Sequence, residues 1–396
     1  MKNTGGENQW CPFRPSAADL ESIGKDVAEI PDIQRKLLAN SADLKFLDRV
    51  AHQYQIAGSR VVLQIANDVP EPLYGVGLFQ PGAQYTGVGR ISTGLGTPHV
   101  ETNPDFLGIM VAFQTPDGQR VDFLGINNPT APTDNHREFM SVLYATAASA
   151  GADVPFIGKL GAHDLVNLGA QQTEFGLALA HRMGVIKAGE TLLHLTKQTL
   201  PTALSSTAYQ RYWTGIVEVG GTGGKFTFVP TREENHAPGF HVSPRHLTED
   251  WKNKQARGDI KFQLFWIPFL SEEKTPTKPL TQPWQENHKQ LVGVTVFPRT
   301  DLDSEEPRLW AILATEMGAN PGNWAADKLN SIPQPASEFG VARKIAYKKS
   351  QEGRGALEPN FYQSVFSTAQ IAPELAHELR RRHDMKLKAG HIYQAP

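Results

Sequence analysis

Four short runs with a period of two, between positions 59 and 127, constrain the fold of this chain most strongly. They read RVVLQIAN, QYTGVGRIS, FLGIMVAFQT and QRVDFLGIN, and all are rich in β-branched or apolar residues. This period is typical of β-strands. Pro116-Asp117-Gly118 separates the last two runs and predicts a hairpin. We expect an antiparallel meander that closes into a barrel or forms a strongly curved sheet, because closure removes exposed edges.

Helical patterns flank and interrupt the predicted strands. Residues 16–40 have apolar positions at helical spacing, and Pro31 is expected to kink or restart that helix. Asp134 is the expected N-cap of a helix at 134–150. The predicted fold class is α+β, an antiparallel β-barrel with surrounding helices. Further helices are expected at 153–200, 248–256 and 368–388, a short helix or turn at 43–52, and strands at 212–219, 225–229, 260–268 and 290–297.

Charge and cysteine content exclude several classes of function. The 396 residues include 39 Lys plus Arg and 41 Asp plus Glu, so no basic excess recruits nucleic acid or an anionic membrane. A single cysteine, Cys11, excludes an internal disulfide framework and a Cys-rich metal site. The first ten residues do not resemble a secretory signal, and no stretch approaches the ~20 apolar residues of a membrane span. We therefore expect a soluble, cytoplasmic protein.

The stretch VARKIAYKKSQEGR, at 341–354, places two arginines and a tyrosine on one predicted helical face. Tyr347 follows Arg343 by four residues, and Arg354 follows Tyr347 by seven. A guanidinium stays charged and lowers the pKa of a neighbouring phenol, so Tyr347 is a candidate phenolate. A phenolate can serve as the axial ligand of ferric haem. An amphipathic helix with solvated arginines explains the same pattern, so the motif alone leaves both interpretations open.

Motifs elsewhere in the chain resemble the catalase family. The run RVAH at 49–52 resembles that family's Arg-Val-Val-His, and RIS at 90–92 resembles its Arg-Phe-Ser. Residues 107–129 resemble its Gly-Phe-Ala-Val-Lys-Phe hairpin and its Asp-Leu-Val-Gly-Asn-Asn-x-Pro segment, and the 343–354 spacing matches its proximal helix. The resemblance covers roughly 45–355 in order. It implies an N-terminal arm and helix at 1–44, then a catalase-like haem-binding domain with a C-terminal helical tail at 45–396.

The resemblance implies a haem b (iron protoporphyrin IX) site with a distal side built around His52. His52 would be the general acid-base residue, Ser92 its hydrogen-bond partner, and Asn127 the amide that holds peroxide. A neutral imidazole can take a proton from one peroxide oxygen and return it to the other, which promotes heterolysis of the O–O bond. Asn128 is an alternative to Asn127, because without a gap Ile126 falls where catalases keep their asparagine.

The implied proximal side holds the metal and the charged edge of the cofactor. Tyr347 would be the iron ligand, and Arg343 would keep it ionised. Arg49, Arg90 and Arg354 would pair with the haem propionates, since buried carboxylates need cations and a planar guanidinium suits them. One departure is that the family's His-Ala-Lys-Gly is HQYQ at 52–55, so packing beside the distal histidine differs.

Three hypotheses about function follow. The leading one is a haem b enzyme of the catalase or peroxidase type, with a small-molecule peroxide or a lipid hydroperoxide as substrate. The alternative is a fatty-acid hydroperoxide isomerase or lyase similar to the allene oxide synthase branch, although that branch has threonine where this chain has Ala51. The third is a non-catalytic haem-binding protein. The polar N-terminal arm is compatible with a homo-oligomer.

Three other features are assigned no function. His236, His241 and His246 lie in a proline-containing region without the spacing of zinc motifs, and they are interpreted as structural. The run GGTGGK at 220–225 lacks the full phosphate-loop pattern and predicts a hairpin turn. The basic triplet at 380–382 has acidic neighbours and predicts a solvated helix face.

Overall fold

Eight antiparallel strands close into a barrel in this computed structural model. The structure describes residues 10–94, 96, 101, 104–150, 162–199, 206–231, 243, 245–321 and 333–391, and at 162–172 it describes only the backbone. The order is β1-β2-β3-β4-β5-β7-β8-β9, and β9 pairs with β1. The predicted barrel is confirmed. The strands are β1 (Gln55–Ile65), β2 (Gln84–Thr93), β3 (Leu107–Gln114), β4 (Arg120–Ile126), β5 (Tyr212–Thr214), β7 (Thr222–Pro230), β8 (Ile260–Pro268) and β9 (Gln290–Phe297), while β6 (Val217–Val219) and β10 (Gln334–Pro335) extend the sheet beside β7.

Alternate side chains of these strands fill the barrel interior. Phe123 packs edge-on against Phe226, with ring centroids 5.1 Å apart. Phe262 packs in the same manner against Tyr212 and Phe297. All five belong to one buried apolar cluster. Because successive side chains of a strand point to opposite faces, the residues between them face outward. The barrel is therefore a packed core, and a large cavity can only lie against its outer surface.

Two predicted hairpin turns are confirmed. Gly118 has a φ of 82° between β3 and β4, and Gly220 and Gly221 have φ values of 56° and 79° between β6 and β7. This left-handed conformation suits glycine because it has no Cβ. The glycine-rich run is more strand than expected, since β7 already begins at Thr222 and pairs with β6 and β8. The single strand expected at 212–219 is divided into β5 and β6.

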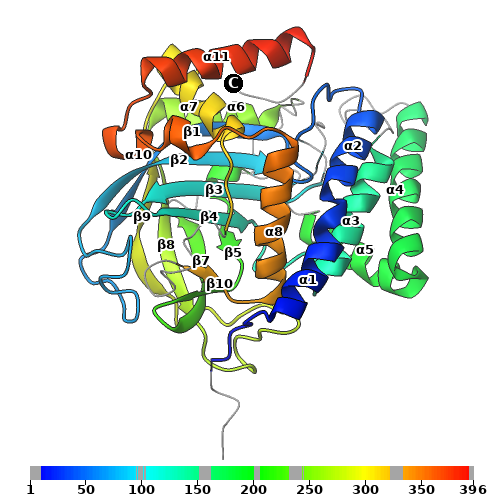
Figure 1. Cartoon of the computed structure of the whole chain (residues 1–396), viewed down its shortest axis with the longest axis horizontal. Helices are drawn as coiled ribbons and strands as arrows, with labels where there is room; N and C mark the ends of the chain where they lie inside the picture. Colours follow the sequence, from blue (N-terminus) through cyan, green and yellow to red (C-terminus); the bar gives the residue numbers. More distant parts are fainter. Residues whose placement is uncertain are drawn as a thin grey trace, which may run out of the picture.

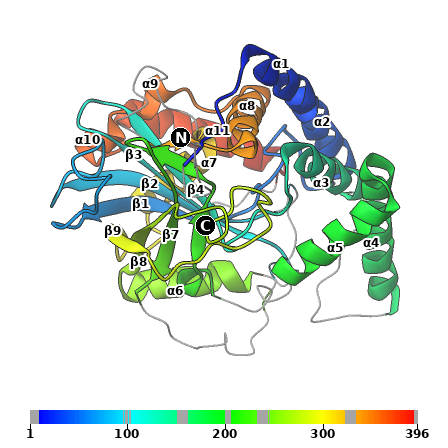
Figure 2. The same ribbon diagram turned by 90° about the horizontal axis from the view of Figure 1, so that it is seen from below.

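Helices cover the barrel from several sides (Figures 1 and 2). In both views α4 lies farthest from the strands, and Figure 1 shows α8 between the strands and α1 to α3. Helix α7 packs against β1, and α11 packs on α7. No helix of the described residues combines the length and the apolar character that crossing a membrane requires. The helices are α1 (Ala17–Asp26), α2 (Ile30–Asn40), α3 (His136–Ser149), α4 (Ala162–Met183), α5 (Val185–Thr199), α6 (His246–Arg257), α7 (Glu305–Glu316), α8 (Glu338–Gly353), α9 (Pro359–Tyr362), α10 (Val365–Thr368) and α11 (Pro373–Lys388), with 3-10 turns at Val27–Glu29 and Thr207–Tyr209.

Several helix predictions are corrected by the structure. Helix α3 is capped by Asn135, whose side chain accepts from the Glu138 amide at 3.0 Å. Asp134, the predicted cap, instead accepts from the backbone amide of Thr281 at 3.2 Å. Helix α11 begins at 373 rather than 368, because Ala369 adopts a left-handed conformation. Residues 43–52, expected as a short helix or turn, form turns and bends.

Helix α7 had no counterpart in the sequence prediction. All of its residues from 309 to 316 are buried. A helix that is buried on every side lacks the amphipathic period by which a helix is detected from sequence.

The restart of the N-terminal helix near Pro31 was predicted correctly, since a 3-10 turn separates α1 from α2.

We expect Phe262→Ala to destabilise the protein strongly. Phe262 is fully buried between Tyr212 and Phe297, so truncating its side chain leaves a cavity. The closed barrel cannot relax enough to fill this cavity. The free energy of unfolding, measured by denaturant titration, should fall by about 3–5 kcal/mol. Phe361→Ala is the matched control, because Phe361 is 52% exposed and should change stability by less than about 0.5 kcal/mol. Equal effects of the two substitutions would contradict this packing.

Candidate functional site

A cavity of about 1020 Å³ lies against the outer face of the barrel. Its walls come from the loop before β1, from β2 to β5 and β7, and from helices α3, α4, α5 and α8. The volume is at the upper end of the roughly 300–1,000 Å³ typical of small-molecule sites. Val27 and Ile30 also line it, so the segment expected as a separate arm and helix at 1–44 contributes to the wall. Every predicted site residue except Asn127 lines this one cavity.

His52 is held rigidly in the loop that leads into β1. Its backbone has a φ of 55°, and its amide donates to the Gly94 carbonyl at 2.8 Å. The ring atom Nδ1 lies 3.2 Å from Ser92 Oγ and 3.1 Å from the Thr93 carbonyl oxygen. Because a carbonyl oxygen only accepts, Nδ1 carries the proton and donates it there. The free lone pair of the imidazole is therefore on Nε2.

A glycine on the adjoining strand makes room for the His52 ring. Gly108 of β3 pairs with Ile126 of β4 on one side and with Ser92 of β2 on the other. A Cβ at position 108 would lie 2.5 Å from His52 Nδ1 and 2.9 Å from Ser92 Oγ. A side chain there would displace the imidazole or break its hydrogen bond, so Gly108 belongs to the site. Its predictive signal was its place in the catalase-like strand motif.

The surroundings of His52 favour the neutral imidazole. Burial lowers the pKa of His52 to about 4, and the positive charges of Arg90 and Arg343 act in the same direction. Asp105, which accepts from the Gly94 amide at 2.8 Å, opposes the shift. The net result is a base that is uncharged at neutral pH and can accept a proton at Nε2.

Tyr347 and Arg343 form a pair on α8, as their spacing predicted. Ser337 caps this helix by accepting from the Gly340 amide. One turn further on, Arg343 Nη2 lies 3.4 Å from Tyr347 Oη, and the guanidinium also lies 5.5 Å from the centre of the phenol ring. Both side chains line the cavity.

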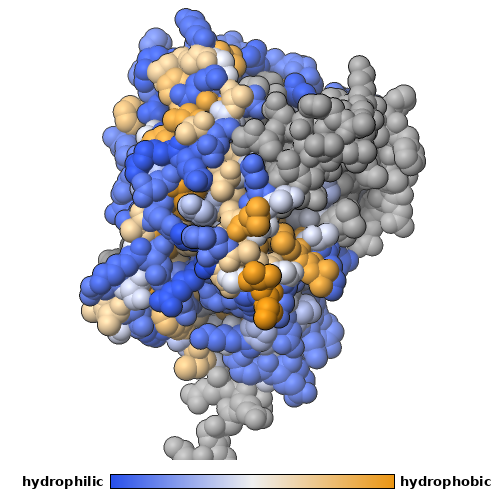
Figure 3. All heavy atoms as spheres, turned by 90° about the vertical axis from the view of Figure 1, so that its right-hand side faces the viewer, coloured by the Kyte–Doolittle hydropathy of each residue, from blue (hydrophilic) through white to orange (hydrophobic). Residues whose placement is uncertain are grey.

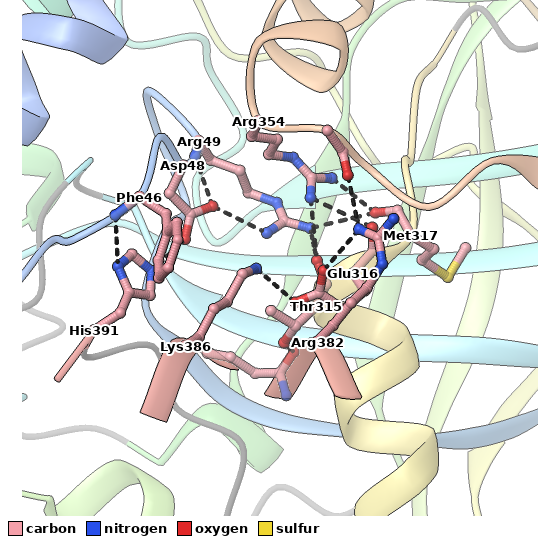
Figure 4. A network of polar contacts seen from close by, with 12 residues as sticks. Phe46, Asp48, Arg49, Thr315, Glu316, Met317, Arg354, Arg382, Lys386 and His391 are labelled. Atoms are coloured by element: carbon pink, nitrogen blue, oxygen red, sulfur yellow. Dashed lines mark hydrogen bonds and ion pairs between the residues drawn. The ribbon is translucent and has the colours of Figure 1, made fainter. Parts of the chain in front are cut away.

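Arg49 and Arg354 converge on the C-terminal end of α7 (Figure 4). Arg49 Nη2 donates to the Thr315 carbonyl at 2.6 Å, and Arg354 Nη2 donates to the Met317 carbonyl at 2.8 Å. Arg354 is the C-cap of α8, so it follows the last helical residue and does not extend the helical face as predicted. Two guanidinium groups at carbonyls of a helix end interact favourably with its dipole.

Arg90 completes a group of three buried cations. Its Nε donates to Gln55 Oε1 at 3.1 Å and its Nη2 to the Gln53 carbonyl at 2.9 Å, so it sits on neutral partners. Burial and the repulsion by Arg49 lower the pKa of Arg90, and the same causes lower the pKa of Arg354 to about 9. Arg354 Nε is buried without a hydrogen-bond acceptor among the described residues, and Arg49 Nη1 makes no hydrogen bond there, although it lies 3.5 Å from Asp48 Oδ1. Asp48 pairs with only one of the three guanidinium groups among the described residues, so a further anion would be favourable here.

Acidic residues and the C-terminal helix support this arginine group from behind (Figure 4). Asp48 is buried, and its Oδ1 lies 3.5 Å from Arg49 Nη1. Burial by itself would raise the pKa of Asp48, but the hydrogen bond to His391 and the charge of Arg49 hold this pKa far below its usual range. Glu316 is buried and pairs with Lys386 of α11 at 2.6 Å and with Arg382 at 3.4 Å. The triplet at 380–382 is therefore only partly the solvated face that was predicted. Sequence reasoning missed this support because its members are far apart in the chain.

The amide predicted for the distal side is not on the cavity wall. Asn127 Oδ1 accepts from the Leu107 amide at 2.8 Å, and the residue is buried beside the wall. Its neighbours Ile126 and Asn128 line the cavity, because successive residues alternate between faces. Asn128 Nδ2 donates to the Gln198 carbonyl at 3.3 Å. The wall next to His52 is thus apolar at Ile126, as the alignment without a gap implied.

Only one of the three histidines that were interpreted as structural lies among the described residues. His236 and His241 lie outside the described residues. His246 begins α6 and is buried.

Solved structures of catalases share this fold. A bacterial catalase superposes with a TM-score of 0.56 at 18% identity, over 89% of this chain and 64% of that chain. A fungal catalase superposes with a TM-score of 0.58 at 14% identity, over 93% of this chain and 69% of that chain. Catalase A from Saccharomyces cerevisiae superposes with a TM-score of 0.57 at 13% identity, over 84% of this chain and 64% of that chain. The chain thus spans slightly less than two thirds of the bacterial catalase. No protein-family model and no curated protein matches the sequence. The prediction of a catalase-like fold is confirmed.

We expect the His52 imidazole to titrate near pH 4 in the haem-free protein. The unfolded chain, with an ordinary histidine pKa of 6.5, then binds more protons than the folded one between pH 6.5 and about 4. The stability that neutral His52 contributes is present above pH 6.5 and is lost as the pH falls through this window. NMR titration, with His52→Gln to assign the resonance, measures the pKa. Wild type should also lose more stability than His52→Gln across the same range, and a titration near pH 6.5 would contradict the burial of the ring.

Proposed function

We propose that the cavity binds haem b and that the protein is a haem-dependent enzyme that reacts with hydroperoxides, of the catalase or peroxidase type. One observation carries the proposal most. A tyrosine with an arginine at its phenol oxygen and a neutral histidine with its basic nitrogen free line the same cavity. This combination provides an anionic ligand for a metal and a base for a protonated substrate.

The residues that line the cavity fit the group. Tyr347 would hold the iron, and Arg343 would keep the phenol ionised. The N–H groups of Arg49 and Arg354 that make no hydrogen bond among the described residues, together with Arg90, would bind the two propionates. Each buried arginine is then compensated, and the free-energy cost of the cluster falls. When bound, the haem would supply the redox chemistry of O–O cleavage.

The chain itself would move the proton. His52 Nε2 would take a proton from one hydroperoxide oxygen and return it to the other, so that water or an alcohol leaves. Nδ1 stays bound to the Thr93 carbonyl and fixes the ring in the required tautomer. Gly108 allows the ring to lie against the strand. Ser92 would support the orientation at 3.2 Å.

A second candidate is a fatty-acid hydroperoxide isomerase or lyase. The observation that favours it is the distal wall, where Ile126 lines the cavity and the side chain of Asn127 binds the backbone of Leu107. The side chain of Ile126 cannot hold hydrogen peroxide by a hydrogen bond and suits a substrate with a hydrocarbon chain. The amide nitrogen of Asn128, which also lines the cavity, is already bound to the Gln198 carbonyl. Oxygen release from hydrogen peroxide, compared with consumption of a lipid hydroperoxide, separates the two candidates.

Tyr347→Phe should change how the protein holds haem. After reconstitution with haemin, wild type should show a ferric Soret band with tyrosinate-type charge-transfer features. The variant should lose these features and retain haem less well on gel filtration, because the anionic ligand is gone. Tyr144→Phe is the matched control, since Tyr144 is also helical and lies 4.7 Å from an arginine, Arg182, but does not line the cavity. If the spectrum of Tyr347→Phe equals that of wild type, Tyr347 is not the ligand. If wild type stays colourless after addition of haemin, the proposed function is wrong.

His52→Gln should keep haem and lose peroxide turnover. General acid-base catalysis by a positioned side chain contributes about 10²–10⁴-fold, so the rate of hydroperoxide consumption should fall by this order. The Soret absorbance per protein should stay the same. His194→Gln serves as the control. His194 lies on α5, its ring forms a hydrogen bond with the Ala131 carbonyl, and it does not line the cavity. Undiminished turnover in His52→Gln would place the proton carrier elsewhere.

A further inference from the structure

A buried lysine faces the cavity and has no part in the proposed haem chemistry. Lys225 lies on β7, is 5% exposed and lines the cavity. Its neighbour Phe226 points into the barrel core, so Lys225 points outward. Lysine is rarely buried without a partner of opposite charge. The position therefore needs a physical explanation.

The contacts of Lys225 within the protein are neutral. Its Nζ lies 3.5 Å from the Pro129 carbonyl oxygen and 4.7 Å from the centre of the Trp284 ring. No ion pair of Lys225 occurs among the described residues. Burial lowers the pKa of Lys225 to about 8, against the opposing charge of Glu286, so the ammonium remains mostly protonated at neutral pH. An unpaired buried cation on a cavity wall offers an anion a favourable partner.

Lys225 and the arginine group lie toward opposite ends of α8. Arg354 caps the C-terminus of this helix. Lys225 follows Gly224, which pairs with Val217, and Val217 pairs with Pro335 just before the helix begins. Helix α8 has 16 residues and is therefore roughly 24 Å long. A ligand bound at Lys225 would not compete with propionates at the arginines.

Apolar side chains form much of the cavity wall that α3, α4, α5 and β5 contribute. They include Leu143, Phe175, Leu192, Leu195 and Trp213, and several threonines of the same helices lie among them. A hydrocarbon chain fits such a lining, whereas hydrogen peroxide would use none of it.

Helices α4 and α5 and the turn between them also expose four large apolar side chains. Leu177, Val185, Ile186 and Leu193 are between 57% and 82% exposed. Figure 3 shows apolar residues gathered on this face, the right-hand side of Figure 1. Exposed apolar groups of this size often accompany sites for lipophilic ligands. They agree with a substrate that is itself amphipathic.

We propose that Lys225 binds the carboxylate of an elongated apolar acid, and that the hydroperoxide which this protein takes is carried on such a chain. The ammonium pairs with the head group, and the apolar walls bury the chain. The second part rests on the proposed function, whereas the binding of the acid does not. No covalent step is involved, and Lys225 acts as a specificity residue.

Lys261, on the strand next to β7, provides a comparison for the burial and pairing of Lys225. Lys261 lies on β8, which pairs with β7, and its side chain is 46% exposed with Asp259 at 3.3 Å. It is solvated and paired, and it does not line the cavity. Lys225 differs in burial, in pairing and in the cavity that it faces. Lys261 is therefore the matched control for a substitution of Lys225.

The test compares the binding of dodecanoate and dodecan-1-ol to the haem-reconstituted protein by isothermal titration calorimetry. Wild type should bind dodecanoate about tenfold more tightly than the alcohol, as expected for one charge-assisted hydrogen bond. Lys225→Met should lose this preference and still bind the alcohol as wild type does. Lys261→Met should keep the preference. Lys225→Gln provides a second neutral variant if thermal unfolding shows that the methionine variant does not fold.

Further outcomes separate this inference from the proposed function. Equal dodecanoate affinity in wild type and Lys225→Met overturns the role of Lys225, and so does tighter binding of dodecyl phosphate than of dodecanoate. Peroxide turnover with intact haem and no preference for the acid overturns only the inference. An intact preference in a protein that holds no haem overturns only the proposed function. With a fatty-acid hydroperoxide as substrate, Lys225→Met should raise KM about tenfold for the acid and leave KM for its methyl ester unchanged.

Discussion

Three guanidinium groups buried at one end of a cavity are the constraint on which the rest of the structure depends. Burial and mutual repulsion lower the pKa values of Arg90 and Arg354, so these charges must be compensated. Asp48 supplies one buried carboxylate, and the carbonyls that end α7 supply the negative end of a helix dipole. Glu316 in turn is held by cations of α11. The loop before β1, the end of α7, the end of α8 and the C-terminal helix therefore meet at one place.

A neutral imidazole, that of His52, lies on the barrel wall in contrast to these charged groups. A packed barrel interior leaves only outward positions for polar residues, and β2 presents Arg90 and Ser92 there at a spacing of two. His52 reaches the same wall from a loop with a positive φ, and Gly108 gives it space. Several independent contacts fix the ring, so little reorganisation would be needed for proton transfer. Preorganisation here comes from strand register.

Local patterns explain which parts of the site could be predicted. Arg343 and Tyr347 are four residues apart, so helical geometry alone brings them to 3.4 Å. The strands followed from their period, and the hairpin at Gly118 from its turn residues. Asn127 was assigned by motif, but the alternation of β4 turns it toward the Leu107 backbone and leaves Ile126 on the wall. Helix α7 was missed because burial on all sides removes its amphipathic signal.

The sequence by itself determined the barrel, the tyrosine–arginine helix and the resemblance that joins His52 to them, because each depends on residues close together in the chain or on an ordered motif. The tertiary structure alone decided which polar groups remain without partners. Arg49 meets the end of α7 across more than 260 residues, and Lys225 faces the cavity because of strand pairings that no local pattern encodes. Burial and pairing depend on long-range contacts, and these contacts set the charge that each end of the cavity offers to a ligand.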